Sequence, residues 1–213
     1  MEQLFYLIGI IVYGAQGVVA LWGGFSAVLA WRRASQLQFR NELEQDEFLD
    51  QLEEQLLNRR VDAAIELCED DRRALPQLAL DAIEMREMEF TKLKRRLTER
   101  FESDVLADLE HRLSWVGTVI KVAPMLGLFG TVIGMMGAFA NLGSGTKVDS
   151  AQLAVDIFFA LITTAIGLAT AMPLLVCAAA VNMRIRKMED MVSSGLTRLL
   201  DTMKVVSQAV RSR

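Results

Sequence analysis

The sequence predicts an all-α membrane protein with three transmembrane helices, a helical cytoplasmic insert, and long helices that extend from the membrane into the cytoplasm. Two observations predict this class. The chain has 213 residues, 52% hydrophobic and 23% charged, and the two kinds are segregated along it. Three uncharged runs occur, at Gln3–Trp31, Val122–Thr146 and Ile157–Met183. Each is longer than the ~20 residues that a helix needs to cross the hydrocarbon core of a bilayer.

The first run is interpreted as a retained transmembrane helix. No basic segment precedes it, and it is longer than the about 7–15 apolar residues of a secretory signal. Cytoplasmic flanks of membrane helices carry an excess of Lys and Arg. Such residues follow the first and third runs, at Arg32, Arg33, Arg184, Arg186 and Lys187. The N-terminus is therefore expected outside the membrane and the C-terminus in the cytoplasm.

The region 32–114 is expected to be helical and cytoplasmic. It holds 14 Lys/Arg and 21 Asp/Glu, a net charge of −7. Leu49, Leu52 and Leu56 form an apolar stripe at helical spacing, and "VDAAIELCEDD" reads as a short amphipathic helix. From Pro76, at a first helical turn, the pattern predicts one unbroken helix to Pro124. The tail 184–213 has a net charge of +4 from 7 Lys/Arg and 3 Asp/Glu, which suits anionic lipid headgroups or the acidic region of a neighbouring subunit.

Enzymatic, metal and nucleic-acid sites find no support in the sequence. His111 is the only histidine, so neither a His-based triad nor a zinc site is expected. Cys68 and Cys177 are too few for a disulfide framework. "GSGTKV" lacks the spacing of a phosphate-binding loop. We expect no catalytic residue, no metal and no cofactor, and therefore no enzyme, and nothing indicates a nucleic-acid partner.

The second apolar run contains "APMLGLFGTVIGMMGAF", which has more glycine than a stable soluble helix tolerates. On a helix, small residues fall on one side, including Gly127, Gly130, Thr131 and Gly134. In the third run Asp156, Thr163 and Thr170 recur every seven residues, with Gly167 beside them. One interpretation is a packing seam of small residues, in which each Thr satisfies its hydroxyl on a backbone carbonyl. The other is a narrow polar pore that both helices line.

The blocks "APMLGLFGTVIGM" and "ALITTAIGLATAMP" resemble the MotA/TolQ/ExbB proton channel family, and most closely its ExbB/TolQ branch. The resemblance implies an inner-membrane motor driven by the proton motive force. Five copies would surround a dimer of an ExbD/TolR-like single-span partner, whose aspartate carries protons, and force would reach a TonB-like or other periplasmic effector. The family's threonines map onto Thr131 and Thr164, and its prolines onto Pro124 and Pro173. The glycines would let the helices crowd a pore, Pro124 would mark a break near the inner end of the span, and Thr131 would supply a polar group.

The apolar runs and their basic flanks set the expected order of segments, and the resemblance agrees with it and names the outer compartment as the periplasm. These are a first transmembrane helix at 1–31, a cytoplasmic region at 32–114, a second transmembrane helix at 115–142, a periplasmic loop at 143–152, a third transmembrane helix at 153–183 and a cytoplasmic amphipathic helix at 184–213.

One position departs from the family pattern. Many ExbB and TolQ proteins carry a glutamate five residues before the threonine of the third helix, and this chain has Phe159 there. Asp156 is the acid that directly precedes the third apolar run, and we expect it either to replace that glutamate in part or to be a helix-start residue. Two other functions stay open: a non-conducting scaffold of the same fold, and a small-solute transporter, although no inverted repeat is present.

Overall fold

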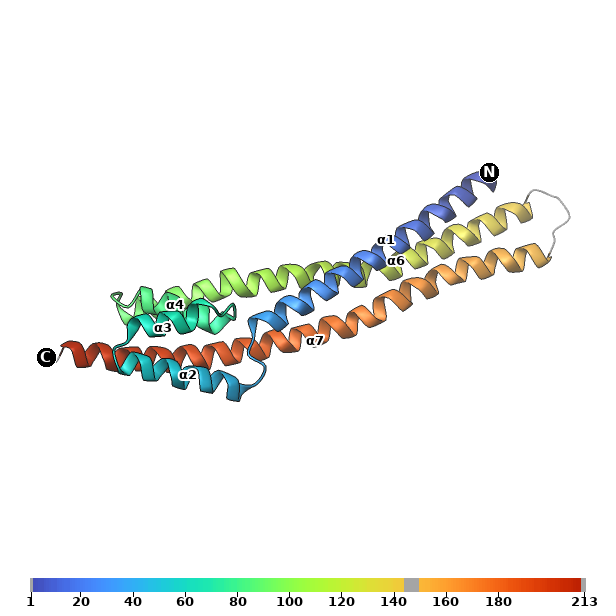
Figure 1. The fold of residues 1–213 in the computed structure, drawn as a ribbon. Coiled ribbons are helices and arrows are strands. Elements are labelled where there is room, and N and C mark those ends of the chain that lie inside the picture. The colour runs from blue at the N-terminus through green and yellow to red at the C-terminus, as the bar shows by residue number, and fades with distance from the viewer. Residues whose placement is uncertain (1, 144–149, 212–213) are drawn as a thin grey trace. The chain divides into compact units, whose positions relative to one another are not determined.

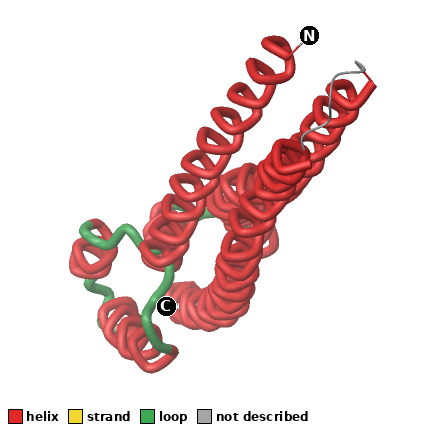
Figure 2. The backbone as a smooth tube through the Cα atoms, turned by 90° about the vertical axis from the view of Figure 1, so that its right-hand side faces the viewer, coloured by secondary structure: helices red, strands yellow, loops and turns green. Residues whose placement is uncertain are grey.

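A computed structural model of the chain describes residues 2–143 and 150–211. Every regular element in these residues is a helix, and they contain no strand (Figure 2). Three helical segments are long and apolar enough to cross a membrane, at Leu7–Leu37, Phe90–Ala140 and Leu153–Val206. The predicted all-α class with three helices that could cross a membrane is confirmed. The loop predicted at 143–152 lies mostly outside the described residues.

The described residues form two compact units, and long helices belong to both (Figure 1). Unit 1 comprises 1–30 and 112–180, and unit 2 comprises 31–111 and 181–213. The elements in chain order are α1 (Glu2–Leu37), α2 (Glu42–Leu57), α3 (Val61–Glu69), α4 (Ala74–Glu84), α5 (Phe90–Arg100), the π-helical turn η1 (Phe101–Leu106), α6 (Ala107–Gly143) and α7 (Ser150–Arg211).

Unit 1 consists of parts of α1, α6 and α7, which are the three apolar helices. Their core contains Ala27 of α1, Val116 and Val119 of α6, and Leu174 of α7. Gly23 lets α1 approach this core closely, since a Cβ added there would lie 2.6 Å from Val119 Cγ1. Large apolar side chains elsewhere on the three helices are exposed, as expected of helices that face lipid or other chains.

Unit 2 packs short amphipathic helices against the C-terminal part of α7. The predicted stripe of Leu49, Leu52 and Leu56 is buried, and the predicted helix at "VDAAIELCEDD" is α3, whose Cys68 is fully buried. The α2 side chain of Gln45 donates a hydrogen bond from Nε2 to the Met191 carbonyl of α7 at 2.7 Å.

The predicted unbroken helix from Pro76 to Pro124 is wrong. Helix α4 ends at Glu84 and the next helix begins only at Phe90. Arg100 Nη1 nevertheless lies 2.8 Å from Asp81 Oδ1, two residues that one straight helix would separate by about 28 Å. The chain therefore reverses between α4 and α5, and both helices bury apolar side chains, such as Leu78 of α4 and Leu97 of α5. From Phe90 the chain is then helical to Gly143, through η1 into α6.

Candidate proton pathway and helix seam

Glycines form a seam where α6 meets α7 within unit 1. A Cβ added at Gly127 would lie 2.7 Å from the Thr163 carbonyl oxygen, and one at Gly134 would lie 2.6 Å from Ala160 Cβ. At Gly130 the added atom would be 2.5 Å from Thr163 Oγ1. Contacts this short leave no room for a side chain, so these glycines allow the two backbones to touch. The small-residue face of α6 is therefore covered by α7 of the same chain.

Thr163 lies inside this seam. Only 3% of its surface is exposed, and its hydroxyl lies 2.9 Å from the Gly127 carbonyl oxygen and 2.7 Å from that of Ala160. A hydroxyl has one proton and donates to one of these acceptors at a time. The residue was predicted for a pore, and the structure gives it a hydrogen bond between α6 and α7 of one chain.

Thr131 and Thr164 have different surroundings. Thr131 is half-buried, and its hydroxyl donates to the Leu128 carbonyl of its own helix at 2.7 Å. The Thr164 hydroxyl is buried and has no hydrogen-bond partner within the described part of the chain. On α7, Asp156 is half-buried, while Phe159, which stands where the family has its glutamate, is 55% exposed.

The two prolines of the motif do not end their helices. Helix α6 continues through Pro124 and α7 through Pro173, so the break expected at Pro124 is absent. Gly167 is the reason that α7 comes close at this level: a Cβ there would lie 2.5 Å from the Ala123 carbonyl oxygen and 3.3 Å from Pro124 Cα.

Helix α1 contributes two polar side chains that the sequence analysis missed. Tyr13 donates its hydroxyl to the Phe159 carbonyl at 2.8 Å, and Gln16 Nε2 donates to the Thr163 carbonyl at 2.7 Å. Gln16 is only 4% exposed. The sequence feature that could have predicted this contact is an amide in the interior of an uncharged run, where a polar group is costly unless it is hydrogen-bonded.

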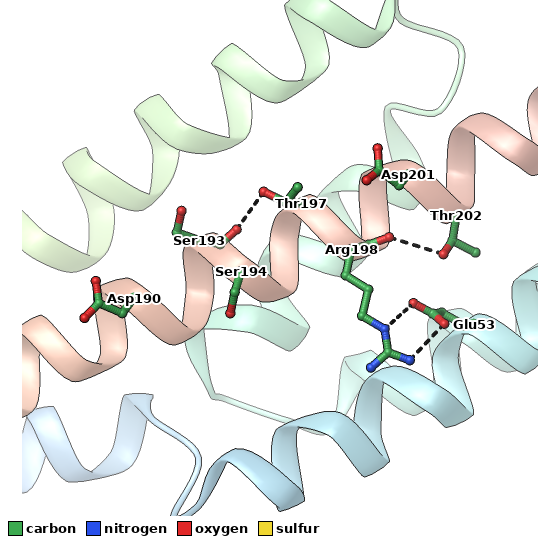
Figure 3. A pocket seen from close by; sticks show the side chains of 8 residues that line it. All are labelled: Glu53, Asp190, Ser193, Ser194, Thr197, Arg198, Asp201 and Thr202. Atoms are coloured by element: carbon green, nitrogen blue, oxygen red, sulfur yellow. Dashed lines mark hydrogen bonds and ion pairs between the residues drawn. The ribbon is translucent and has the colours of Figure 1, made fainter.

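A polar pocket in unit 2 is built around an arginine on α7 (Figure 3). Arg198 pairs with Glu53 at 2.9 Å and Asp46 at 3.5 Å, and also with Asp50. Hydrogen bonds to Asp50 and Glu53 raise the pKa of Arg198. The hydroxyls of Thr197 and Thr202 donate to carbonyls of their own helix. These groups tie α7 to α2, and the arrangement contains no pairing of a nucleophile with a base. The lining residues are Glu53, Asp190, Ser193, Ser194, Thr197, Arg198, Asp201 and Thr202.

The described residues also give no support for a metal site or a reactive thiol. Within residues 2–143 and 150–211, no group of three or more His, Cys, Asp or Glu side chains could hold a metal ion. Burial and, to a smaller extent, Asp71 raise the pKa of the Cys68 thiol to about 12, which keeps it protonated and unreactive.

Comparison with known proteins places these features in a family. Residues 33–194 match the family model of the MotA/TolQ/ExbB proton channel family. The Tol-Pal system protein TolQ of Haemophilus influenzae is 38% identical over 85 residues, which cover 40% of this chain and 37% of that protein. A biopolymer transport protein ExbB homologue of Methanothermobacter thermautotrophicus is 46% identical over 70 residues, which cover 33% of this chain and 24% of that one.

The biopolymer transport protein ExbB-like 2 of Helicobacter pylori is 38% identical over 85 residues, which cover 40% of this chain and 55% of that protein. The matched segments thus span less than two thirds of these relatives. The family match covers most of this chain and includes both glycine- and threonine-bearing helices. The chain belongs to the MotA/TolQ/ExbB proton channel family, in its ExbB/TolQ branch.

Proposed function

We propose that this chain is an ExbB/TolQ-like subunit of an inner-membrane motor that couples the proton motive force to transport or maintenance at the cell envelope. The observation that carries the proposal is the family match across α6 and α7, together with the uncommitted Thr164 hydroxyl on α7. The polar groups of both helices lie in otherwise apolar spans, which is typical of ion pathways in membranes.

The proposed assembly is a homopentamer around a dimer of an ExbD/TolR-like single-span partner, with a TonB-like or other periplasmic effector. The N-terminus would lie in the periplasm and the C-terminus in the cytoplasm, with transmembrane helices at 1–31, 115–142 and 153–183. Exposed apolar side chains such as Leu21, Phe129 and Val176 support further contacts with lipid or with other copies. Because the α6 seam is filled by α7 of the same chain, the proposed contacts between copies use other faces of these helices.

Thr131 and Thr164 are proposed to face the partner's proton-carrying carboxyl. A hydroxyl both donates and accepts, so it suits a carboxyl in either protonation state. Asp156 is a further proposed member of the pathway. Gly127, Gly130, Gly134 and Gly167 have the packing role, and Pro124 and Pro173 lie within the helices that line the pore.

The test is proton flux through the complex of this chain and its partner in proteoliposomes. Thr131→Val and Thr164→Val keep the side-chain shape and remove the hydroxyl, so the complex is expected to assemble with reduced flux. Thr118→Val is the matched control, because Thr118 is an exposed residue of α6 whose hydroxyl donates only to its own helix, at Ser114 O. Full flux in both Thr131→Val and Thr164→Val would contradict a role of these two hydroxyls in the proton pathway.

A second function is favoured by one observation. The exposed Phe159 replaces the family's glutamate, which supports a non-conducting scaffold of the same fold. If the chain is such a scaffold, native mass spectrometry is expected to show that the wild-type chain assembles with its partner. The assembled complex would then pass no protons under an imposed gradient.

A further inference from the structure

Gln16 occupies an unusual place for an amide. It lies in the middle of the apolar part of α1 and is 4% exposed. Its Nε2 donates to the Thr163 carbonyl of α7 at 2.7 Å. The orientation of the amide follows from chemistry, because a carbonyl only accepts and so must face the nitrogen.

The carbonyl that Gln16 holds belongs to the peptide unit that joins Thr163 to Thr164. The same peptide lies against α6, since a Cβ added at Gly127 would be 2.7 Å from the Thr163 carbonyl oxygen and 2.8 Å from Thr164 Cα. The Thr163 hydroxyl in turn lies 2.9 Å from the Gly127 carbonyl oxygen. Helices α1, α6 and α7 therefore meet at the peptide that precedes Thr164.

Thr164 differs from the neighbouring threonines of the two helices. The hydroxyls of Thr131, Thr163 and Thr170 all donate to backbone carbonyls. The Thr164 hydroxyl and the Gln16 amide oxygen are both buried, and neither atom has a hydrogen-bond partner among the described residues. Buried polar atoms without partners are rare, and each needs an explanation, of which a functional role is one. Thr164 thus has a hydroxyl free for a proton-carrying group, on a peptide that Gln16 fixes.

We propose that Gln16 is a positioning residue for Thr164: its hydrogen bond to the Thr163 carbonyl sets the orientation in which the Thr164 hydroxyl meets the proton-carrying carboxyl of the partner. The inference rests on the proposed function, and it adds α1 to a pathway otherwise assigned to α6 and α7. Tyr13 is the natural comparison, because it makes the same kind of α1–α7 bond one turn away, at Phe159, where no free hydroxyl follows.

The experiment measures proton flux of the full complex in proteoliposomes for Gln16→Leu, Thr164→Val, their double variant and Tyr13→Phe. Removal of one ordinary hydrogen bond corresponds to about a tenfold change, so Gln16→Leu is expected to lower the flux about tenfold. Tyr13→Phe loses an equivalent bond and is expected to keep wild-type flux. The double variant is expected to conduct as Thr164→Val alone does, since Gln16 acts through Thr164.

Gln16→Glu supplies a pH readout that wild type lacks. In its protonated form the carboxyl can donate to the Thr163 carbonyl as the amide does, and in its ionised form it cannot. Flux is expected near the wild-type level at low pH and to fall as the new carboxyl ionises. This variant decides the question by itself if Gln16→Leu fails to assemble: equal flux relative to wild type across the pH range in which infrared spectroscopy shows the introduced carboxyl to ionise would overturn the proposal.

Three other results would overturn it: wild-type flux in Gln16→Leu, an equal loss in Tyr13→Phe, or fully additive losses in the double variant. Failure of the proposed function looks different. In that case the wild-type complex passes no protons, or Thr131→Val and Thr164→Val both conduct as wild type does, and the role of Gln16 falls with it.

Discussion

Gly127→Ala tests the seam between α6 and α7 most directly. The added Cβ would meet the Thr163 carbonyl oxygen at 2.7 Å and Thr164 Cα at 2.8 Å. Both are backbone atoms, which cannot rotate away as a side chain can. To restore an ordinary contact of at least 3.4 Å, the helices must separate by several tenths of an ångström. That movement would also stretch the bond from the Thr163 hydroxyl to the Gly127 carbonyl.

The magnitude follows from a matched pair. Gly117 also lies in α6, and a Cβ added there would meet nothing within 4 Å. Both alanine variants gain the same helix propensity, up to about 1 kcal/mol relative to glycine. Their difference in free energy of unfolding therefore isolates the overpacking cost, about 1–3 kcal/mol. The assay is reversible unfolding of each purified variant in mixed detergent micelles, followed by circular dichroism. Equal stability of Gly127→Ala and Gly117→Ala would show that α6 and α7 are not in close contact at Gly127.

Three further predictions concern acids and thiols. Asp156→Asn removes a proton-binding group in the apolar span and is expected to lower proton flux through the assembled complex. The flux is expected to recover when Phe159→Glu is added to Asp156→Asn. Unchanged flux in Asp156→Asn would mean that Asp156 has a structural role only. Cys68 is fully buried and its pKa is raised to about 12. In a Cys177→Ala background, maleimide is therefore expected to label Cys68 only when denaturant unfolds unit 2. Rapid labelling of the native protein would contradict this prediction. Burial raises the pKa of Asp81, although Arg100 acts to lower it. The folded state thus binds the Asp81 proton more tightly than the unfolded state does. Wild type is therefore expected to gain stability relative to Asp81→Asn as the pH falls through the pKa of Asp81 in the folded state. A stability difference between wild type and Asp81→Asn that does not change with pH would contradict a raised pKa at Asp81.

Local patterns in the sequence determined the class of this protein. Hydropathy and charge are properties of short windows, and a membrane span needs only length and apolar composition, so the three spans could be predicted without knowledge of any contact. The stripe of Leu49, Leu52 and Leu56 and the helix α3 were equally accessible, since helical spacing alone shows which residues share a face.

What each helix face contacts depends on packing between distant segments and became visible only in the folded chain. The sequence left the small residues of α6 open between a packing seam and a pore, and the structure covers Gly127, Gly130 and Gly134 with α7 of the same chain. The reversal after α4 was missed for a similar reason, because the pair of Asp81 and Arg100 lies far apart in sequence and becomes visible only when the chain turns back.

The adjacent threonines of α7 show the limit most clearly. Thr163 and Thr164 are identical in chemistry, yet Thr163 donates its hydroxyl within the seam while the Thr164 hydroxyl has no partner in the described chain. Successive residues on a helix point about 100° apart, so neighbours in sequence can have different surroundings. The sequence is enough to predict that α7 carries hydroxyls inside an apolar span. Which hydroxyl is committed to packing, and that Gln16 of α1 holds the peptide between the two, depends on where three helices meet, which no local pattern encodes.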